Sequence, residues 1–418
     1  MKSPQKSLNT YMTNYLKSSL PQEPQIHGLK KIFVFIFFSL CLMPYFTIGI
    51  TISDVQPWYA VIGWALLLSH RNLKFTYFET IFLIFSFIYI FALDFYGVDN
   101  LISVIRKQIS ILFLFPVLVL TRLYGNYLNG QLIFYVSLVY LFFVVSQIFF
   151  PSLYDALGIF FNQKVTEIGA RGISGMMAEP TDFGFFSMCM IVLTMLKKKS
   201  FSSTSKYYFT LGLFVFFGLI TFSGSAYVTL FLILLLLFFQ SRISASKKIF
   251  ILIASALGLI ILFSSLIEIR GFSILTSLLT DPLFVINNTS FSYRFYSNLV
   301  AIFYFFDSYG VGCGVGCMDS VALPVIEKYS LFNNLDNLYY KQQLLEFFSQ
   351  EQPNSIFSEL IFHTGILGVI FLTCIFIKLI KNNTFGKKFT VLVFFLYLMQ
   401  SFPLLFPIPW LLLALKNE

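Results

Sequence analysis

The residue best suited to acid–base chemistry is His363, one of three histidines in the chain. It follows Glu359 by four residues in an apolar segment, a spacing that places both side chains on one face of a helix. Such a carboxylate orients an imidazole as a general base, and the same pair also occurs as a purely structural hydrogen bond. No Ser-His-Asp combination and no set of metal ligands is visible, so we expect neither a metal nor a cofactor.

A second group of charged residues lies in the segment 171–184, RGISGMMAEPTDFG. Pro180 suits the first turn of a helix, and Glu179 and Asp182 suit the positive end of its dipole. Either the segment caps this helix, with Arg171 pairing with Glu179, or it presents a fixed arginine and a carboxylate to a substrate. Arginine is the preferred ligand of pyrophosphate because its planar guanidinium binds two oxygens at once.

Arg294 stands in an aromatic stretch, FSYRFYS, at 291–297. One interpretation is an arginine at a membrane surface, with its stem on apolar groups and its charge in water. The other is a second ligand for an anionic substrate.

A glycine-rich run, GVGCGVG at 310–316, lacks the preceding strand and the lysine of a nucleotide-binding loop. We therefore predict a turn of permissive backbone there. The run contains Cys313 and is followed by Cys317, but these cysteines lack CxxC spacing and have no histidine nearby, which argues against zinc. A disulfide between them is the less favoured interpretation.

The amino-acid composition indicates whether these residues lie in a water-soluble or a membrane-embedded chain. The chain has 418 residues, of which 57% are hydrophobic and only 11% are charged, and Phe alone occurs 55 times. A soluble domain carries about 25% charged residues. This composition excludes a soluble enzyme, a nucleic-acid-binding domain and a disordered protein, and it predicts a chain embedded in lipid.

Apolar runs long enough to cross a bilayer predict an all-α, polytopic integral membrane protein. The final run contains three prolines, so it forms one span or two, which gives 11 or 12 spans. The predicted spans are 32–50, 56–69, 79–96, 108–121, 131–150, 181–196, 207–222, 226–240, 249–267, 356–377 and 389–415.

The distribution of Lys and Arg predicts the orientation. The basic clusters at 197–206, 242–248 and 378–388 must share one side, which we assign to the cytoplasm together with an N-terminal tail, 1–29. Residues 30–418 then form a single transmembrane domain with two large outer loops, 151–180 and 268–355. Helical stretches are expected in the second loop at 299–306 and 321–326. The basic residues left outside are Arg106, Lys107, Lys164, Arg171, Arg270, Arg294, Lys328 and Lys341.

Four short motifs, in order, resemble those of O-antigen polymerases, a family of membrane glycosyltransferases that is grouped with the O-antigen ligases. They are RG…EPT…G at 171–184, SGS at 223–225, GVGCG at 310–314 and NS…TGILG at 354–368. The similarity covers roughly residues 130–380 and includes the order of spans and outer loops. Two positions depart from the family: Ala226 follows the SGS turn where Arg is frequent, and Pro353 precedes Asn354 where His is common.

The resemblance implies a GT-C-like fold in the bacterial inner membrane, with the active site on the periplasmic face. It also implies transfer of a growing glycan from undecaprenyl pyrophosphate to the sugar of a lipid-linked repeat unit. Arg171 and Arg294 would bind the pyrophosphate, and Glu179 or His363 would accept the proton of the attacking hydroxyl. The implied partners are the lipid-linked glycan, membrane lipids and a chain-length regulator, without nucleic acid or cofactor.

Two other functions stay open. An O-antigen ligase would pass the finished glycan to lipid A-core, and the sequence does not separate acceptors well. A transporter or flippase usually carries ionisable groups near the middle of the membrane, where they mark a pathway. Here Glu79, Asp94 and Glu268 lie at the ends of spans, which favours chemistry at the surface over transport.

Overall fold

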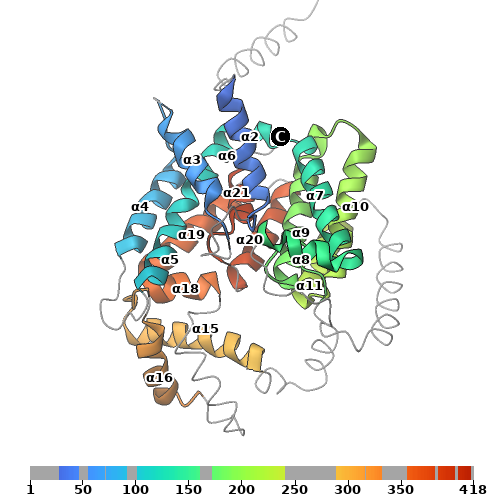
Figure 1. Ribbon diagram of the computed structural model, residues 1–418. Helices are drawn as coiled ribbons and strands as arrows, with labels where there is room; N and C mark the ends of the chain where they lie inside the picture. The colour runs from blue at the N-terminus through green and yellow to red at the C-terminus, as the bar shows by residue number, and fades with distance from the viewer. Residues whose placement is uncertain are drawn as a thin grey trace, which may run out of the picture.

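The computed structural model describes residues 28–46, 55–70, 72–91, 101–160, 172–240, 289–315, 317–331, 355–381, 385–400 and 403–415. Within these ranges the chain is helical and forms no strand, which confirms the expected all-α class (Figure 1). The helices are α2 (Leu29–Leu42), α3 (Trp58–Leu68), α4 (Tyr77–Phe91), α5 (Leu101–Phe113), α6 (Phe115–Tyr124), α7 (Gly130–Phe149), α8 (Pro151–Leu157), α9 (Pro180–Leu196), α10 (Thr204–Ile220), α11 (Gly224–Gln240), α15 (Thr289–Asp307), α16 (Met318–Lys328), α18 (Ile356–Thr364), α19 (Ile366–Ile380), α20 (Phe385–Met399) and α21 (Pro407–Ala414). Short 3-10 turns occur at Gly125–Tyr127, Gly158–Phe160 and Lys198–Ser200.

Two helical stretches in the described part are both long and apolar enough to cross a bilayer. They are Gln108–Tyr127 and Gly130–Phe149, with mean hydropathies of 1.6 and 2.3. Shorter apolar helices of 10–17 residues accompany them at Trp58–Leu68, Tyr77–Phe91, Pro180–Leu196, Thr204–Ile220, Ala226–Phe239, Ile366–Ile380 and Lys388–Met399. The predicted span at 249–267 lies outside the described residues.

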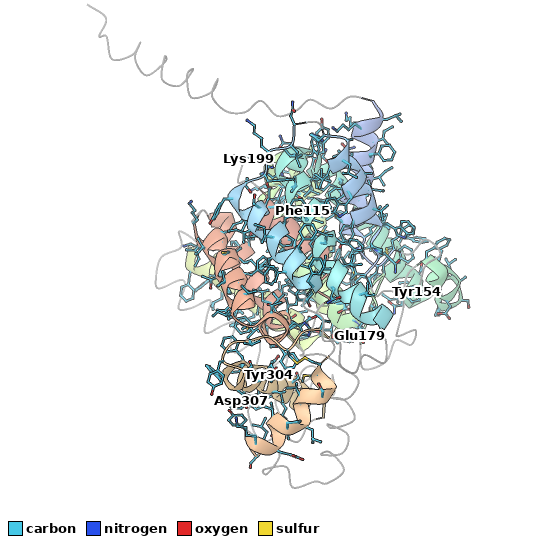
Figure 2. All side chains as sticks on the ribbon, turned by 90° about the vertical axis from the view of Figure 1, so that its left-hand side faces the viewer. Phe115, Tyr154, Glu179, Lys199, Tyr304 and Asp307 are labelled. Carbon is cyan, nitrogen blue, oxygen red and sulfur yellow. A yellow bond between two sulfur atoms is a disulfide. The ribbon has the colours of Figure 1, made fainter. Side chains whose placement is uncertain are left out.

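Most helices run roughly alongside one another as a bundle, and α15 and α16 lie together beyond one end of it (Figure 1). We call α15 and α16 the cap. Its two helices contain the stretches 299–306 and 321–326, which confirms that these stretches are helical. The beginning of α2 lies at the opposite end of the bundle. Figure 2 likewise places Lys199 far from Asp307 of the cap, so the two ends of the bundle differ in the residues they present.

Helix α9 is the centre of the bundle. Every residue from Phe183 to Thr194 is buried, and the helix contacts α10, α11, α20 and α21. A helix that is apolar on all sides is stable only when other helices surround it. Glycines permit the close packing, because a Cβ on Gly184 would lie 2.7 Å from the Cβ of Ala226 and one on Gly218 would lie 2.3 Å from Met188.

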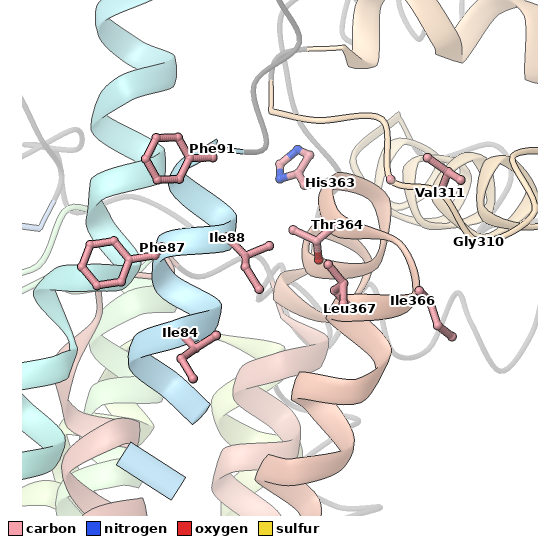
Figure 3. A pocket seen from close by; sticks show the side chains of 11 residues that line it. Ile84, Phe87, Ile88, Phe91, Gly310, Val311, His363, Thr364, Ile366 and Leu367 are labelled. Atoms are coloured by element: carbon pink, nitrogen blue, oxygen red, sulfur yellow. The ribbon is translucent and has the colours of Figure 1, made fainter. Parts of the chain in front are cut away.

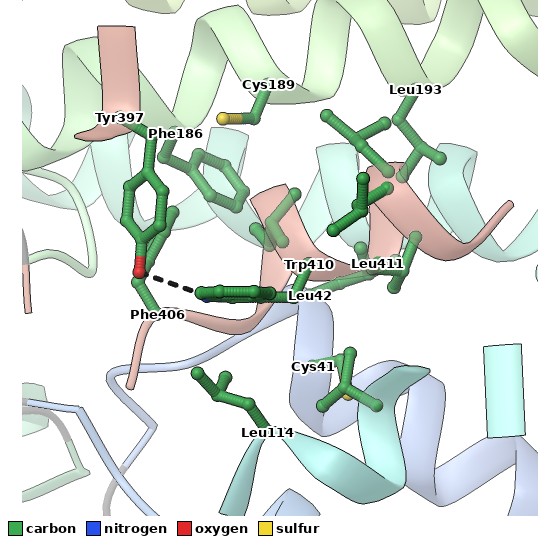
Figure 4. Packing of buried hydrophobic residues seen from close by; sticks show 14 of the residues in the cluster. Cys41, Leu42, Leu114, Phe186, Cys189, Leu193, Tyr397, Phe406, Trp410 and Leu411 are labelled. Atoms are coloured by element: carbon green, nitrogen blue, oxygen red, sulfur yellow. Dashed lines mark hydrogen bonds between the residues drawn. The ribbon is translucent and has the colours of Figure 1, made fainter. Parts of the chain in front are cut away.

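The C-terminal segment forms two elements, α20 and a short helix α21 that packs back against it. Every residue of α21 is buried. Tyr397 joins the two, since its hydroxyl donates to the carbonyl of Leu404 at 2.8 Å and accepts from the indole N–H of Trp410 at 3.2 Å (Figure 4). Of the two predicted arrangements for 389–415, the structure contains the broken one.

Candidate functional site

The segment expected to form one span after residue 355 is broken at Gly365, between α18 and α19. Gly365 has a φ of 60°, in the region that favours glycine. A Cβ at this position would also lie 2.0 Å from the carbonyl oxygen of Gly310. The break therefore requires glycine for two reasons. It ends α18 just after His363 and Thr364, and both residues line a pocket.

His363 lies in a buried polar cluster with Glu359 and Tyr89. Its Nδ1 atom is 4.0 Å from Oε1 of Glu359, which confirms that the two side chains share one face of α18. The hydroxyl of Tyr89, from α4, lies 3.1 Å from the same Nδ1 and donates to Glu359 at 3.4 Å. Tyr89 therefore bridges the histidine and the carboxylate, and His363 itself is only 1% exposed.

The pocket beside this cluster has a volume of about 740 Å³ (Figure 3). Its walls are apolar and come from α4 and α19, while the polar side chains among its lining residues are those of His363 and Thr364. The apolar lining consists of Ile84, Phe87, Ile88, Phe91, Val311, Ile366 and Leu367, with Gly310 and Gly312 beside them. This combination suits an amphiphilic ligand, with a hydrocarbon part along the walls and a polar part at the histidine.

Residues 310–314, which we call the glycine loop, connect the end of α15 to the region of the break. Gly310 and Gly314 have φ values of 80° and 93°, so the predicted turn of permissive backbone is confirmed. The carbonyl of Gly310 accepts a hydrogen bond from the N–H of Ile366 at 2.8 Å. The loop therefore lies directly on the start of α19 and forms one side of the pocket.

A disulfide joins Cys313 to Cys317, with Cα atoms 6.1 Å apart. The structure therefore contains the less favoured of the two interpretations, a disulfide. Sequence spacing was a poor guide because the glycine loop bends the chain sharply between the two cysteines. The other cysteines, Cys41, Cys189 and Cys374, are free.

The first turn of α18 is anchored to the cap through polar side chains. The hydroxyl of Ser355 accepts the N–H of Ser358 at 3.2 Å, which is a standard N-cap interaction. Both serines also donate to the side-chain oxygen of Asn298 in α15, Ser355 at 3.1 Å. Helix α18 is thus fixed at its start by Asn298 of the cap and at its end by the glycine loop.

Glu179 occupies the N-cap position of α9, with Pro180 in the first turn, as predicted. The Glu179 side chain is half-buried, and its backbone carbonyl accepts from the N–H of Phe183 at 3.1 Å. Asp182 in the same turn accepts a hydrogen bond from the hydroxyl of Tyr45 at 3.1 Å. Negative side chains are stabilised here by the helix dipole.

The loop 172–179 that precedes α9 is held by buried polar groups. Oε1 of Gln147 accepts the N–H groups of Ser174 and Gly175, at 3.2 and 3.0 Å. The hydroxyl of Tyr154 donates to the carbonyl of Gly175 at 2.5 Å. These contacts satisfy backbone groups that would otherwise be buried without partners.

Two motifs that are distant in the sequence meet at this loop. The N–H of Ile173 donates to the carbonyl of Ile220 at 3.2 Å, and a Cβ on Gly172 would lie 2.2 Å from the carbonyl oxygen of Thr221. On the other side of the loop, Gly184 of α9 packs against Thr221 and Ser223. The described part of the first motif, 172–184, therefore packs against the chain at 220–223, where the SGS turn begins.

The two arginines of the predicted site are not placed by these contacts. Arg171 lies outside the described residues, so its pairing with Glu179 stays a prediction. The backbone of Arg294 belongs to the first half of α15, but its side chain also lies outside what the structure describes.

Other polar clusters lie away from the pocket and have structural explanations. Glu79 and Thr76 form a capping box at the start of α4, and Arg122 bonds to Oε1 of Glu79 at 2.6 Å. His70 lies 3.1 Å from the amine of Lys30 and 2.7 Å from the hydroxyl of Tyr124. Burial and the charge of Lys30 lower the pKa of His70 below its ordinary value of 6.5.

Of the predicted site residues, Glu179 and His363 belong to different elements, α9 and α18, and α20 contacts both helices. Figures 1 and 2 place α18 and Glu179 in the half of the bundle nearer the cap. Tyr89 was missed. It precedes His363 by 274 residues and lies within an apolar run, so nothing in the sequence distinguishes it.

In the part of the chain that the structure describes, no group of three or more His, Cys, Asp or Glu residues could hold a metal ion. No family model matches the chain, nor does any curated protein or any solved structure.

Proposed function

We propose that the protein is a GT-C-like membrane glycosyltransferase of the O-antigen polymerase type, located in the bacterial inner membrane. It transfers a growing glycan from undecaprenyl pyrophosphate to the sugar of a lipid-linked repeat unit on the periplasmic face, with a chain-length regulator as partner. The observation that carries the proposal is the apolar pocket that ends on the cluster of His363, Glu359 and Tyr89. A lipid-linked sugar has the same division into an apolar and a polar part.

A location in lipid is supported by the outer faces of the helices. Large apolar side chains are exposed on several of them, among them Leu68, Phe142, Phe149, Phe216, Phe231, Ile370 and Ile377. With only 11% charged residues in the chain, too few polar groups exist to cover such faces in water. A bilayer provides the matching solvent.

The proposed orientation is supported by cysteine chemistry as well as by charge. The Cys313–Cys317 disulfide lies on the cap side, and disulfides persist in oxidising compartments such as the periplasm. Lys199 and the start of α2 lie at the other end, which we assign to the cytoplasm. Both arguments support a position of the pocket near the periplasmic face.

The hydrogen bonds around His363 favour its role as general base. A tyrosine has one hydroxyl proton, and Tyr89 donates it to Glu359. In the tautomer of His363 that carries its proton on Nδ1, the Tyr89 oxygen accepts that proton and the lone pair lies on Nε2. A neutral histidine in this tautomer can accept the proton of a sugar hydroxyl.

In the proposed reaction the acceptor hydroxyl oxygen forms a bond to the anomeric carbon of the donor glycan. The bond from that carbon to the pyrophosphate oxygen breaks, the hydroxyl proton passes to Nε2 of His363, and undecaprenyl pyrophosphate leaves. Arg171 and Arg294 are assigned to the negative charge of the leaving group. Glu179 is the second candidate for the base, but it is absent from the residues that line the pocket.

A deletion strain tests the function, with surface glycans separated on a gel. Lipid A-core bearing a single repeat, with the ladder restored by the intact gene, is the result expected for a polymerase. Core without any repeat, together with polymer on the undecaprenyl carrier, would make the protein a ligase. Repeat units retained on the inner leaflet would make it a flippase and remove the basis of the site.

The arginine assignment has its own test. Arg171→Ala is expected to abolish polymer while the amount of protein in the membrane stays unchanged, because the pyrophosphate loses its bidentate ligand. Chain lengths like those of the wild type in this variant would contradict the assignment.

A further inference from the structure

The C-terminus of α18 is capped by a segment from elsewhere in the chain. The last carbonyls of a helix have no partners within the helix. Here the N–H of Cys313 donates to the carbonyl of Phe362 at 2.8 Å, and the N–H of Gly314 donates to the carbonyl of His363 at 3.0 Å. The glycine loop therefore holds the backbone of the proposed base directly.

This contact is possible only without side chains. A Cβ on Gly312 would lie 2.2 Å from the carbonyl oxygen of His363 and 2.6 Å from the N atom of Thr364. On the other side of the break, Gly310 accepts the N–H of Ile366. The loop thus supplies hydrogen-bond partners to the end of α18 and to the beginning of α19, and it fixes the angle at which His363 meets the pocket.

The glycine loop is in turn fixed to the cap by the disulfide. Cys317 precedes α16 and is buried in a hydrophobic cluster with Val300, Met318 and Phe362. The ring of Phe362 also packs edge-on against Tyr304 of α15, with centroids 5.4 Å apart. One covalent bond therefore connects the loop on His363 to the packed interior of the cap.

We propose that the Cys313–Cys317 disulfide is a positioning element for His363, so that the site works fully only in its oxidised form. The role of His363 as the base rests on the proposed function, whereas the coupling between disulfide and loop does not. A dithiol reductant would cleave the S–S bond, giving two cysteine thiols and the oxidised reductant. Activity would then depend on the oxidising state of the outer compartment.

The expected defect follows from which parts of the site the disulfide holds. Without the bond, only the main chain links Cys313 to Cys317, so the glycine loop holds the end of α18 less firmly and the Tyr89–His363 contact lengthens. Most of the apolar lining belongs to α4 and α19, and these walls keep their packing. The turnover number should therefore fall about tenfold or more, since a displacement near 1 Å costs up to about 100-fold, while KM for the lipid-linked unit changes little.

Hydrogen exchange tests the coupling without any assay of activity. The full chain in lipid nanodiscs is compared before and after treatment with dithiothreitol. Faster exchange in peptides covering 310–317 and 361–366, with no change in α7, is the expected result. Cys374→Ser serves as control, since its disulfide is intact and it should respond as the wild type does. Unchanged exchange at 361–366 after verified reduction would overturn the proposal.

Kinetics test the consequence for the site. Reduced wild type and a Cys313→Ser/Cys317→Ala variant should share the lowered turnover number and the unchanged KM, and reoxidation should restore only the wild type. Equal turnover in the oxidised and reduced forms would overturn the positioning role. A wild-type protein that makes no polymer in either state would overturn the proposed function instead, and hydrogen exchange then decides the coupling alone.

Discussion

The regions around His363 and Glu179 contain the same kind of contact between a glycine and a backbone carbonyl, but the contact serves a different purpose in each. In both, a glycine lies against a backbone carbonyl at the end of a helix: Gly312 against His363, and Gly172 against Thr221, each with a hypothetical Cβ 2.2 Å from the carbonyl oxygen. Both regions therefore depend on glycine for close approach of two chain segments.

The regions differ in what locks them and in what they present. Buried side chains, Gln147 and Tyr154, hold the loop before Glu179. Backbone hydrogen bonds and a disulfide hold the loop on His363, and that loop also lines a pocket. The difference indicates that the first region chiefly fixes the start of α9, whereas the second supports the proposed role of His363 at the pocket.

The largest difference between the two regions is expected for a change of the histidine. His363→Ala should lower polymer formation by about 10²–10⁴-fold, the usual contribution of a general base. The measurement is the glycan ladder at equal protein level in the membrane. His70→Ala, which changes a histidine outside the pocket, is the matched control and should keep the ladder. Similar ladders from both variants would remove His363 from the mechanism.

A smaller but still large effect is expected at the glycine loop. Gly312→Ala places a Cβ against the backbone of His363, so the two segments must separate, and activity should fall about 10- to 100-fold. Gly212→Ala is the control, because a Cβ there meets nothing within 4 Å. The assay is the same ladder, with thermal unfolding recorded for each protein. Full activity in Gly312→Ala would show that the loop does not position the base.

The bridge between Tyr89 and His363 should contribute about tenfold. Tyr89→Phe removes the contacts of the hydroxyl with both Glu359 and His363. The contact with His363 is worth about 1–1.5 kcal/mol, because Glu359 at 4.0 Å is too far from Nδ1 to replace it directly. In a pH profile of the turnover number, the maximum should be lower and should lie at a different pH, while KM stays the same. An unchanged profile would leave Tyr89 a packing residue only.

The region of Glu179 is expected to respond in stability more than in chemistry. Gln147→Ala leaves the buried N–H groups of Ser174 and Gly175 without their acceptor, a cost of about 1–3 kcal/mol. Thermal unfolding in nanodiscs measures it, with the exposed Gln131→Ala as control. Activity per folded molecule should stay near that of the wild type. A stable variant without activity would make this region the reactive one.

The smallest expected effect is a pH dependence at the end of the bundle away from the cap. The pKa of His70 is lowered in the folded protein, so the unfolded chain binds more protons than the folded one just below pH 6.5. The contribution of His70 to stability is therefore complete above pH 6.5 and is lost as the pH falls through the folded pKa. Unfolding temperatures of the wild type and His70→Gln should converge on acidification. A constant difference would contradict the assignment.

Local patterns in the sequence predicted the parts of this structure that depend on local physics. The start of α9 at Pro180, the helices of the cap and the shared face of Glu359 and His363 all follow from helix geometry and from capping preferences. The turn of the glycine loop follows from its composition.

The remaining features arise from contacts between distant segments. Apolar residues lie on both sides of Gly365, and the sequence does not show the contact with Gly310 at which α18 and α19 separate. Tyr89 reaches His363 because α4 packs against α19, and the spacing of residues in the sequence does not predict this packing. The disulfide escaped prediction because the local backbone bend, not the number of intervening residues, brings its cysteines together.

The central claim is that His363, held by Tyr89 and the glycine loop, is the base of a glycan polymerase. Purified protein in nanodiscs, supplied with undecaprenyl-pyrophosphate-linked repeat units and nothing else, tests it most directly. The account predicts a ladder of lengthened lipid-linked glycans from the wild type and none from His363→Ala. Unchanged repeat units with the wild type, or equal ladders from both proteins, would contradict it.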